Sequence, residues 1–573
     1  MFITATLVWL SWVLICMTAV GVGRLALRLL RRRTGDMNLD GFRVALWWGL
    51  VTCITALLIW NLLAPLSGAS ALLALAALLV AGIAGWIVSP PRRHFIRRPS
   101  LSEGLLLGGV VLSSLVMSFL TLGMPINYDT GLYHLGSINY AHDFGTVPGL
   151  ANVHDRFGFN SSLFSIAAVL SNGVWAGEGF RLVVGIFLTA MAMDLIARVL
   201  GGAAKWTGRE SFMALTLGLG VSWIYVLQIH GASLASPAAD SVAIVLILVS
   251  SVYLIDAFRQ SGEVATRSAA TAVILSALAG SMRPLNWLYW VMVIMVVWFV
   301  LWRKGHRRLQ ATSLGISGIL LGVMLVRDTL LSGWLLFPMS RLPMPVDWRY
   351  STPESTSSAI TAWSRAPHMP FDYSLSGWQW FGPWLRNLST DWFIVTSVCL
   401  LGIFVILFAT KVRRLNVLYL ACLPALTVLP IWFLAAPDPR FVWGQLLVVG
   451  VVPLSIAACR TRLSGIVVPL VGILLVAAVA VTVSRGSATV VAKDVRPKLV
   501  TVGPVSWTMK LAPPPSVETA DVPLVDGTVT IEPPSDQCWN QFPLCRPAGS
   551  PTDVVRRGPD IGSGFKSAGK ASD

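Results

Sequence analysis

Residues 124–160 bring together several side chains that could do acid–base chemistry, between two long apolar segments. This stretch holds three of the seven histidines of the chain, beside three aspartates. Asp129 comes a few residues after an apolar segment ends, where a carboxylate is partly desolvated. Desolvation raises the pKa of a carboxylate towards the value that a general base needs. We therefore predict that Asp129 is a general base; the alternative is that it only caps a helix beginning near Thr130.

Other polar residues of the same stretch could line a pocket around Asp129. His134 and His142 are eight residues apart, so on one helix they lie two turns along and about 80° around. Each histidine alone could instead be an ordinary residue of the membrane interface. The predicted substrate contacts from this stretch are Tyr128, His134, His142, His154, Arg156 and Asn160. Because the chain has no D-x-D or E-x-D sequence, we predict no metal site, although Asp129 and the histidines make a divalent metal possible.

Three arginines are expected near the same membrane face as Asp129. Arg283 falls in a tight turn between two apolar segments, Arg327 near the end of another, and Arg440 at the start of a third. The planar guanidinium donates two hydrogen bonds at once, which suits phosphate. We predict that these arginines bind a phosphate. One alternative is that each arginine only extends its side chain to the membrane interface; another is that Arg327 pairs with Asp328.

Composition indicates which elements must position these residues. The chain of 573 residues is 55% hydrophobic and 12% charged, against about 25% charged in soluble proteins. About fourteen apolar stretches approach the roughly 20 residues that a spanning helix needs. The sequence therefore predicts an all-α polytopic membrane protein, and it excludes a soluble enzyme, a disordered scaffold and a single-span receptor.

Charge patterning predicts the orientation of the chain. The net charge is +16, and the excess basic residues lie in short runs between apolar stretches, which is typical of cytoplasmic loops rather than of nucleic-acid binding. This pattern places the N-terminus and the C-terminal tail outside. The expected segments are N-terminal spans (1–123), an outer catalytic loop with surface helices (124–179), central spans (180–333), a second outer loop (334–390), C-terminal spans (391–483) and an outer tail (484–573).

Two segments of this scheme need a separate interpretation. Residues 160–176 are apolar enough to span, but counting them would invert every later loop, so we predict a surface or re-entrant helix. The second outer loop carries Trp348, Trp363, Trp378, Trp380 and Trp384. Tryptophan can stack on a sugar ring, but it is also the ordinary residue of the membrane interface, which we favour for most of them.

The tail is expected to form a small cap outside the membrane. Asp526-Gly527 between two β-prone runs predicts a hairpin. Cys538 and Cys545 are seven residues apart and suit a small disulfide loop; the alternative is two free thiols.

Five stretches of the chain carry a family resemblance. They are Tyr128 to His134, Pro148 to Asn160, Ser332 to Pro338, Pro437 to Phe441, and Asp536 to Cys545. In these stretches the chain resembles a group of bacterial multi-span membrane proteins that are usually regarded as similar to the C-type (GT-C) membrane glycosyltransferases. The resemblance runs from about residue 125 to the end and implies a GT-C-like helical bundle in the bacterial cell membrane.

The resemblance also implies an activity and its partners. It implies an inverting glycosyltransferase that moves a sugar from a polyprenyl-phosphate donor to a cell-envelope glycan or lipid acceptor at the outer face. Asp129 would deprotonate the acceptor hydroxyl, while Arg440, with Arg283 or Arg327, would hold the departing lipid phosphate. The alternatives are an envelope polysaccharide polymerase or ligase, a lipid-sugar transporter or flippase, and a structural member of an envelope assembly.

Overall fold

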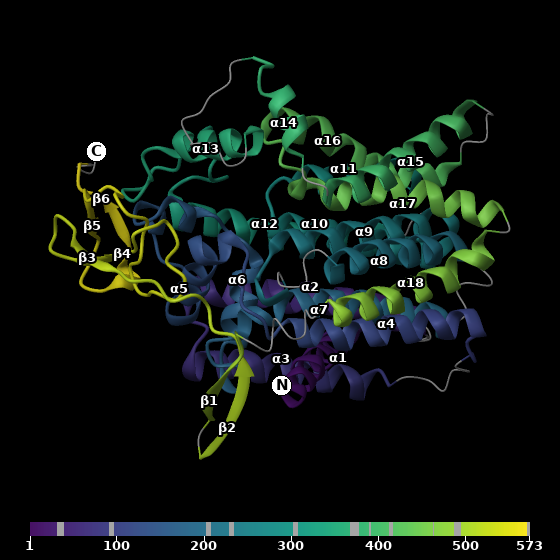
Figure 1. Ribbon diagram of the computed structural model, residues 1–573, viewed down its shortest axis with the longest axis horizontal. Coiled ribbons are helices and arrows are strands. Elements are labelled where there is room, and N and C mark those ends of the chain that lie inside the picture. Colours follow the sequence, from purple (N-terminus) through teal and green to yellow (C-terminus); the bar gives the residue numbers. More distant parts are fainter. Residues whose placement is uncertain are drawn as a thin grey trace.

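The computed structural model (Figure 1) is a bundle of helices that lie mostly along its long axis. It describes all residues except 31–38, 91–96, 202–207, 229–233, 302–306, 367–376, 389–390, 412–415, 462, 486–493, 503 and 570–573. Twelve of the described helical segments are long and apolar enough to cross a membrane, and two shorter apolar helices accompany them. The protein is therefore an all-α polytopic membrane protein, as the composition predicted.

The helices of the bundle follow one another in antiparallel order. The long apolar segments are built on α1 (Phe2–Leu30), α2 (Leu39–Leu63), α3 (Gly68–Val88), α4 (Leu101–Leu120), α7 (Val183–Leu200), α8 (Arg209–Gln228), α9 (Ala239–Arg259), α10 (Gly262–Met282), α12 (Arg307–Ser332), α16 (Leu423–Ala435), α17 (Trp443–Arg460) and α18 (Ser464–Ser484). The two shorter ones belong to α11 (Asn286–Leu301) and α15 (Asp391–Lys411).

One end of the bundle carries the connecting structure that the sequence assigned to the outer face. There lie the loop after α4, with α5 (Leu135–Asp143) and α6 (Ser162–Leu170), helix α13 (Pro353–Arg365) and the C-terminal tail (Figure 1). We call this end the capped end. Most of the basic runs that predicted the orientation, at 31–33, 92–93, 205, 303–304, 413–414 and 462, lie outside the described residues. The side of the membrane that the capped end faces stays a prediction.

The stretch 160–176 does not cross the membrane. Its helix α6 has nine residues, about 14 Å in length at 1.5 Å per residue, which is half the thickness of the apolar core of a bilayer. All of its residues from Ser162 to Val169 are buried. Helix α6 is a short element that packs against α2, α5 and α7 at the capped end. Whether it lies at the membrane surface or is re-entrant stays a prediction.

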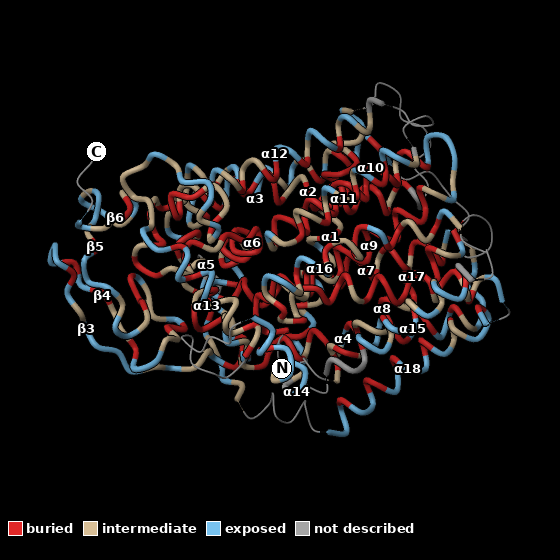
Figure 2. The backbone as a smooth tube through the Cα atoms, turned by 90° about the horizontal axis from the view of Figure 1, so that it is seen from above, coloured by how far each residue is buried: buried red, intermediate tan, exposed pale blue. Residues whose placement is uncertain are grey.

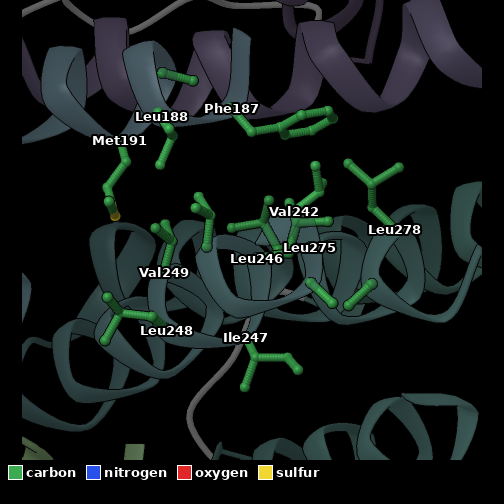
Figure 3. Close-up of a cluster of buried hydrophobic side chains, with 14 of the residues drawn as sticks. Phe187, Leu188, Met191, Val242, Leu246, Ile247, Leu248, Val249, Leu275 and Leu278 are labelled. Atoms are coloured by element: carbon green, nitrogen blue, oxygen red, sulfur yellow. The ribbon is translucent and has the colours of Figure 1, made fainter. Parts of the chain in front are cut away.

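Close packing of the spans depends on small residues and interdigitated aliphatic side chains. A Cβ atom at Gly23 would lie 1.9 Å from the Ala45 carbonyl oxygen, so α1 and α2 approach as closely as they do only because glycine is there. Deeper in the bundle, Phe187 and Leu188 of α7 face Leu246 of α9 (Figure 3). The buried residues run through the middle of the bundle, and the apolar exposed ones lie on its rim (Figure 2).

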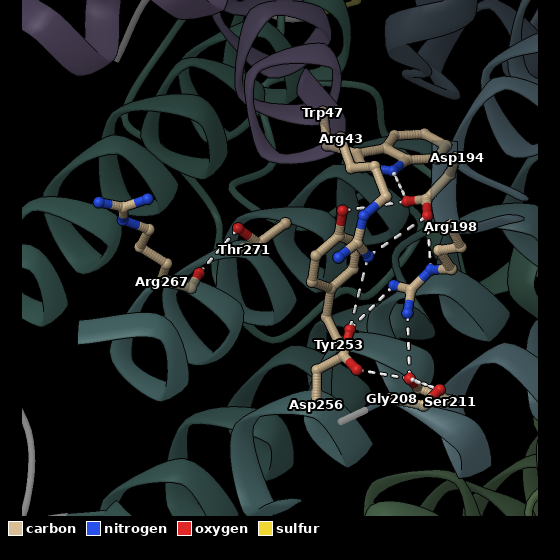
Figure 4. Close-up of polar contacts among 10 residues, drawn as sticks. All are labelled: Arg43, Trp47, Asp194, Arg198, Gly208, Ser211, Tyr253, Asp256, Arg267 and Thr271. Carbon is tan, nitrogen blue, oxygen red and sulfur yellow. Dashed lines mark hydrogen bonds and ion pairs between the residues drawn. The ribbon is translucent and has the colours of Figure 1, made fainter. Parts of the chain in front are cut away.

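A buried charge network joins three spans at the end opposite the capped end (Figure 4). Arg198 Nε lies 2.7 Å from Asp194 Oδ1, and Arg198 Nη2 lies 2.9 Å from Asp256 Oδ2. Arg43 Nη1 lies 3.6 Å from each of the two carboxylates. All four side chains are almost completely buried. Two positive and two negative charges thus compensate one another, and they tie α2, α7 and α9 together.

The tail consists of three short antiparallel hairpins. Their strands are β1 (Arg496–Val502) with β2 (Val505–Leu511), β3 (Ala520–Pro523) with β4 (Val529–Glu532), and β5 (Val554–Arg556) with β6 (Phe565–Ser567). The hairpin predicted from Asp526-Gly527 is confirmed: Gly527 has a φ of +79° in the turn between β3 and β4, which glycine adopts without strain. The predicted disulfide between Cys538 and Cys545 is also present.

Candidate active site

Asp129 and Arg440 meet at the capped end. Asp129 directly precedes a π-helical turn (Thr130–His134), and Arg440 lies in a 3₁₀ turn (Pro439–Val442) that leads into α17. Arg440 Nη1 lies 3.4 Å from Asp129 Oδ2, and Arg440 Nε lies 2.8 Å from Asp438 Oδ2. The Asp438 carboxylate also accepts a hydrogen bond from the backbone N–H of Arg440, at 3.0 Å. The guanidinium is thus held between two carboxylates from different parts of the chain.

A second arginine–aspartate pair stands beside the first. Arg283, which follows α10, donates from Nη2 to Asp240 Oδ2 at 2.7 Å, and its Nε contacts the other oxygen of the same carboxylate. Both guanidinium groups lie over Phe441: the Cζ atom of Arg283 is 4.7 Å and that of Arg440 is 5.2 Å from the ring centroid. The aromatic ring therefore brings two cations to one place, at a favourable distance for cation–π contact.

A cavity of about 280 Å³ begins at these charged groups and continues between the spans. At its polar part it is lined by Asn127, Asp240, Asp438 and Arg440. Most of its remaining lining is apolar and comes from α7, α8, α9, α15 and α17: Val184, Leu188, Val221, Val226, Ile244, Val245, Val395, Trp443 and Leu447. Such a cavity is suited to an amphipathic ligand, with an anionic group at Arg440 and a hydrocarbon chain between the helices.

The electrostatic state of Asp129 differs from the one expected. Burial alone would raise the pKa of this carboxyl, but the Arg440 guanidinium, followed by His134, Arg283 and Arg156, holds the pKa below its ordinary value of 3.8. The expectation of a raised pKa is therefore wrong, because the sequence did not reveal how many cations fold back onto Asp129. The group is a carboxylate at neutral pH, ready to accept a proton or a hydrogen bond.

His134 is the predicted histidine that lies closest to this cluster. Its side chain is buried, packs against the rings of Tyr133 and Phe164, and interacts electrostatically with Asp129. Burial lowers the pKa of His134 to about 4. The imidazole is consequently neutral at physiological pH, so it can donate or accept a hydrogen bond but supplies no fixed charge.

Four other predicted contacts, Tyr128, His142, His154 and Arg156, are not part of the cavity lining. His142 Nδ1 is 2.5 Å from Asp143 Oδ1, and both side chains are partly exposed. His154 is buried beside Asp155, with a pKa lowered by burial to about 4. The Arg156 guanidinium lies over the Phe159 ring at 5.2 Å. The Tyr128 hydroxyl donates to Asp536 of the tail.

Arg327 and Asn160 do not join the cluster. The buried Arg327 side chain donates to Asn61 Oδ1 at 2.9 Å, to Thr146 Oγ1 at 2.7 Å and to Asn160 Oδ1 at 3.2 Å. Asn160 in turn donates to the carbonyl oxygen of Met324 at 3.0 Å. These bonds join α2, α12 and the outer loop, so the role that the structure gives both residues is to hold the capped end together. Neither of them lines the cavity that Arg440 lines.

Two carboxylates of the site were not among the predicted residues. Asp240 begins α9, and Asp438 precedes Arg440 between two prolines. The Pro-Asp-Pro-Arg sequence was a usable signal for Asp438, because an aspartate flanked by prolines often caps a turn. Nothing in the sequence around Asp240 indicates that Arg283 binds it. Among the described residues, no group of three or more histidine, cysteine, aspartate or glutamate side chains is placed to hold a metal ion.

Three tryptophans of the second outer loop pack beside the turn that carries Arg440. Trp378, Trp380 and Trp384 pack with Phe433 of α16. Trp384 Nε1 donates to the carbonyl oxygen of Pro437 at 2.8 Å. This aromatic cluster therefore braces the turn that carries Arg440, and the expected interfacial role of these residues stays a prediction.

The fold and this site define a class: a multi-pass helical membrane protein with a cavity that is charged at one end and mainly apolar between its helices. The chain belongs to the family described as "Domain of unknown function (DUF8201)", whose model matches residues 6–447. The match covers the site from Asp129 to Arg440 and leaves out the tail. No curated protein and no solved structure matches the chain.

Proposed function

We propose that the protein is a glycosyltransferase of the bacterial cell membrane that takes its sugar from a polyprenyl-phosphate donor. The observation that carries the proposal is that Arg440, which lines the polar end of a mainly apolar cavity, pairs with Asp129. A lipid-linked phosphate has the same division into an anionic head and a hydrocarbon chain. The earlier resemblance to GT-C enzymes supports the same assignment, with the capped end and both termini outside the cytoplasm.

The proposed reaction uses the charged groups in the following way. The acceptor hydroxyl passes its proton to Asp129, and its oxygen attacks the anomeric carbon of the donor sugar. The bond between this carbon and the phosphate oxygen breaks, and the electron pair leaves with the phosphate. The Arg440 and Arg283 guanidinium groups stabilise the negative charge that grows on the leaving oxygen. Attack from the face opposite the phosphate inverts the configuration.

Donor binding would also improve Asp129 as a base. In the free site Arg440 holds the pKa of Asp129 below 3.8, and a carboxylate with such a pKa is a weak proton acceptor. A donor phosphate competes for Arg440 and draws it away from Asp129. Loss of this cation raises the pKa of Asp129, so the carboxylate becomes a stronger base only when the donor is in place.

The test is complementation of a strain that lacks the protein, with wild type, Asp129→Asn or Asp143→Asn. Asp143→Asn is the matched control, because Asp143 lies on the rim of the same loop and pairs with His142. We expect wild type and Asp143→Asn to restore a sugar to the envelope glycan. With Asp129→Asn the sugar stays absent and its polyprenyl-phosphate donor accumulates.

Two other results would contradict the proposal. Full restoration by Asp129→Asn would remove Asp129 from catalysis. Accumulation of short, unpolymerised repeat units in the strain would identify a polysaccharide polymerase instead, the main alternative from the sequence.

A further inference from the structure

The tail reaches back across the capped end to the residues on both sides of Asp129. The Tyr128 hydroxyl donates to the Asp536 carboxylate, and Gln537 Nε2 donates to the Tyr128 carbonyl oxygen at 2.9 Å. On the other side of Asp129, the backbone N–H of Trp539 donates to the Gly131 carbonyl oxygen at 2.9 Å. These contacts hold the chain at Tyr128, one residue before Asp129, and at Gly131, two residues after it.

The Trp539 ring fits against Gly131 because residue 131 has no side chain. A Cβ atom at Gly131 would lie 2.5 Å from the indole ring, closer than any side chain tolerates. Gly131 lies in the π-helical turn Thr130–His134, a rare geometry that is frequent at functional sites. The indole therefore covers the turn that follows Asp129 at Gly131, the residue without a side chain.

Trp539 belongs to a small loop that is itself fixed, and Asp536 and Gln537 lie directly before this loop. The disulfide between Cys538 and Cys545 closes it. Its far end is attached to α5, where the backbone N–H of Leu544 donates to the Tyr140 hydroxyl at 3.2 Å. Trp539 and Leu544 both have positive φ, at 49° and 62°, a conformation that non-glycine residues keep only when their surroundings hold them.

We propose that the disulfide-closed loop 536–545 is the positioning element of Asp129. None of the contacts described above touches the carboxylate itself; they fix the backbone on either side of it, so the loop acts through the Asp129 segment and not on the substrate. The inference rests on the proposed function only for its effect on sugar transfer. Its structural part, that the loop holds residues 127–134 in place, can be measured without any activity.

The first test is hydrogen exchange of the full-length protein in lipid nanodiscs. Trp539→Ala and reduction of the disulfide with dithiothreitol should each accelerate amide exchange in residues 127–134 by about tenfold or more. Trp507→Ala is the matched control, because it removes an indole from another hairpin of the tail, β2. It should leave exchange at 127–134 unchanged. Reduction acts on protein that has already folded, so it is informative even if a variant fails to fold.

The second test separates positioning from general stability by kinetics. Trp539→Ala should lower kcat with little change in the KM for the lipid donor, because the cavity is intact, and Trp539→Phe should restore most of the rate by keeping a ring on Gly131. Unchanged exchange at 127–134 after both treatments would overturn the proposal. If Asp129→Asn proves fully active while exchange responds as expected, the glycosyltransferase assignment fails. The proposal that loop 536–545 holds residues 127–134 in place then still stands.

Discussion

Asp129 and Arg440 are separated by 311 residues in the chain, and Arg440 Nη1 lies 3.4 Å from Asp129 Oδ2. Arg440 also lines the cavity. The pair joins the outer loop after α4 to the turn before α17, and so it links the two halves of the bundle at the site. An ion pair that a substrate phosphate can open is a simple way to couple donor binding to the state of the carboxylate.

Arg440 and Arg327 should respond differently to the same substitution. Arg440→Gln removes the guanidinium from the cavity lining, and we expect it to abolish sugar transfer while the protein still folds. Arg327→Gln leaves Asn61, Thr146 and Asn160 without their buried donor, at a cost of about 1–3 kcal/mol for each unsatisfied group. We expect it to lower the unfolding temperature in detergent. Equal unfolding temperatures for the two variants would contradict this division.

Filling the cavity should weaken donor binding without touching the charged groups. Ser241 lines the cavity on α9, and Ser241→Trp places an indole where we expect the hydrocarbon chain. The KM for the lipid donor should rise by about tenfold or more, since each buried CH₂ contributes about 0.8 kcal/mol to binding. Val291→Trp on α11, at a position that is 44% exposed, is the control. A KM that is the same in both variants would place the chain elsewhere.

The two buried histidines of the outer loop predict acid sensitivity. His134 and His154 have pKa values lowered by burial from 6.5 to about 4, so between these limits the unfolded chain binds protons that the folded protein does not. The free energy of unfolding is therefore unaffected by these histidines above pH 6.5. It falls by up to about 3 kcal/mol for each histidine as the pH drops to about 4. Denaturant unfolding of the solubilised protein from pH 7 to 4 measures this loss. His134→Gln should reduce the loss, whereas His142→Gln, on the rim, should leave it as in wild type.

The buried charge network opposite the site should matter for folding and not for chemistry. Asp194→Asn removes one of two negative charges beside Arg43 and Arg198, and breaking such a buried set costs about 3–5 kcal/mol. We expect low yield of folded protein, but unchanged kcat in the fraction that folds. A normal yield together with lost activity would show instead that the network takes part in the function.

Several features of this protein could be predicted from the pattern of its sequence alone. Hydropathy determined that the protein is a helical membrane protein, because burial in lipid requires apolar residues in continuous runs of helical length. It predicted about fourteen spans, and the described residues contain twelve helical segments long enough to cross a membrane and two shorter apolar helices. Alternation of basic and polar loops also placed Asp129, Arg283 and Arg440 at one end. The Asp526-Gly527 hairpin and the Cys538–Cys545 disulfide followed from local chemistry, since a tight turn or a short covalent loop depends on few residues.

Only the tertiary structure decided which of these side chains act together. Arg283 and Arg327 are equivalent in the sequence as arginines near a span end, yet one lies over Phe441 beside Arg440 and the other is enclosed by Asn61, Thr146 and Asn160. The rotation of each helix about its axis makes this difference, and that rotation depends on packing against distant spans. For the same reason the pKa of Asp129 could not be read from its own segment, because Arg440, which lowers it most, and Arg283 come from far along the chain.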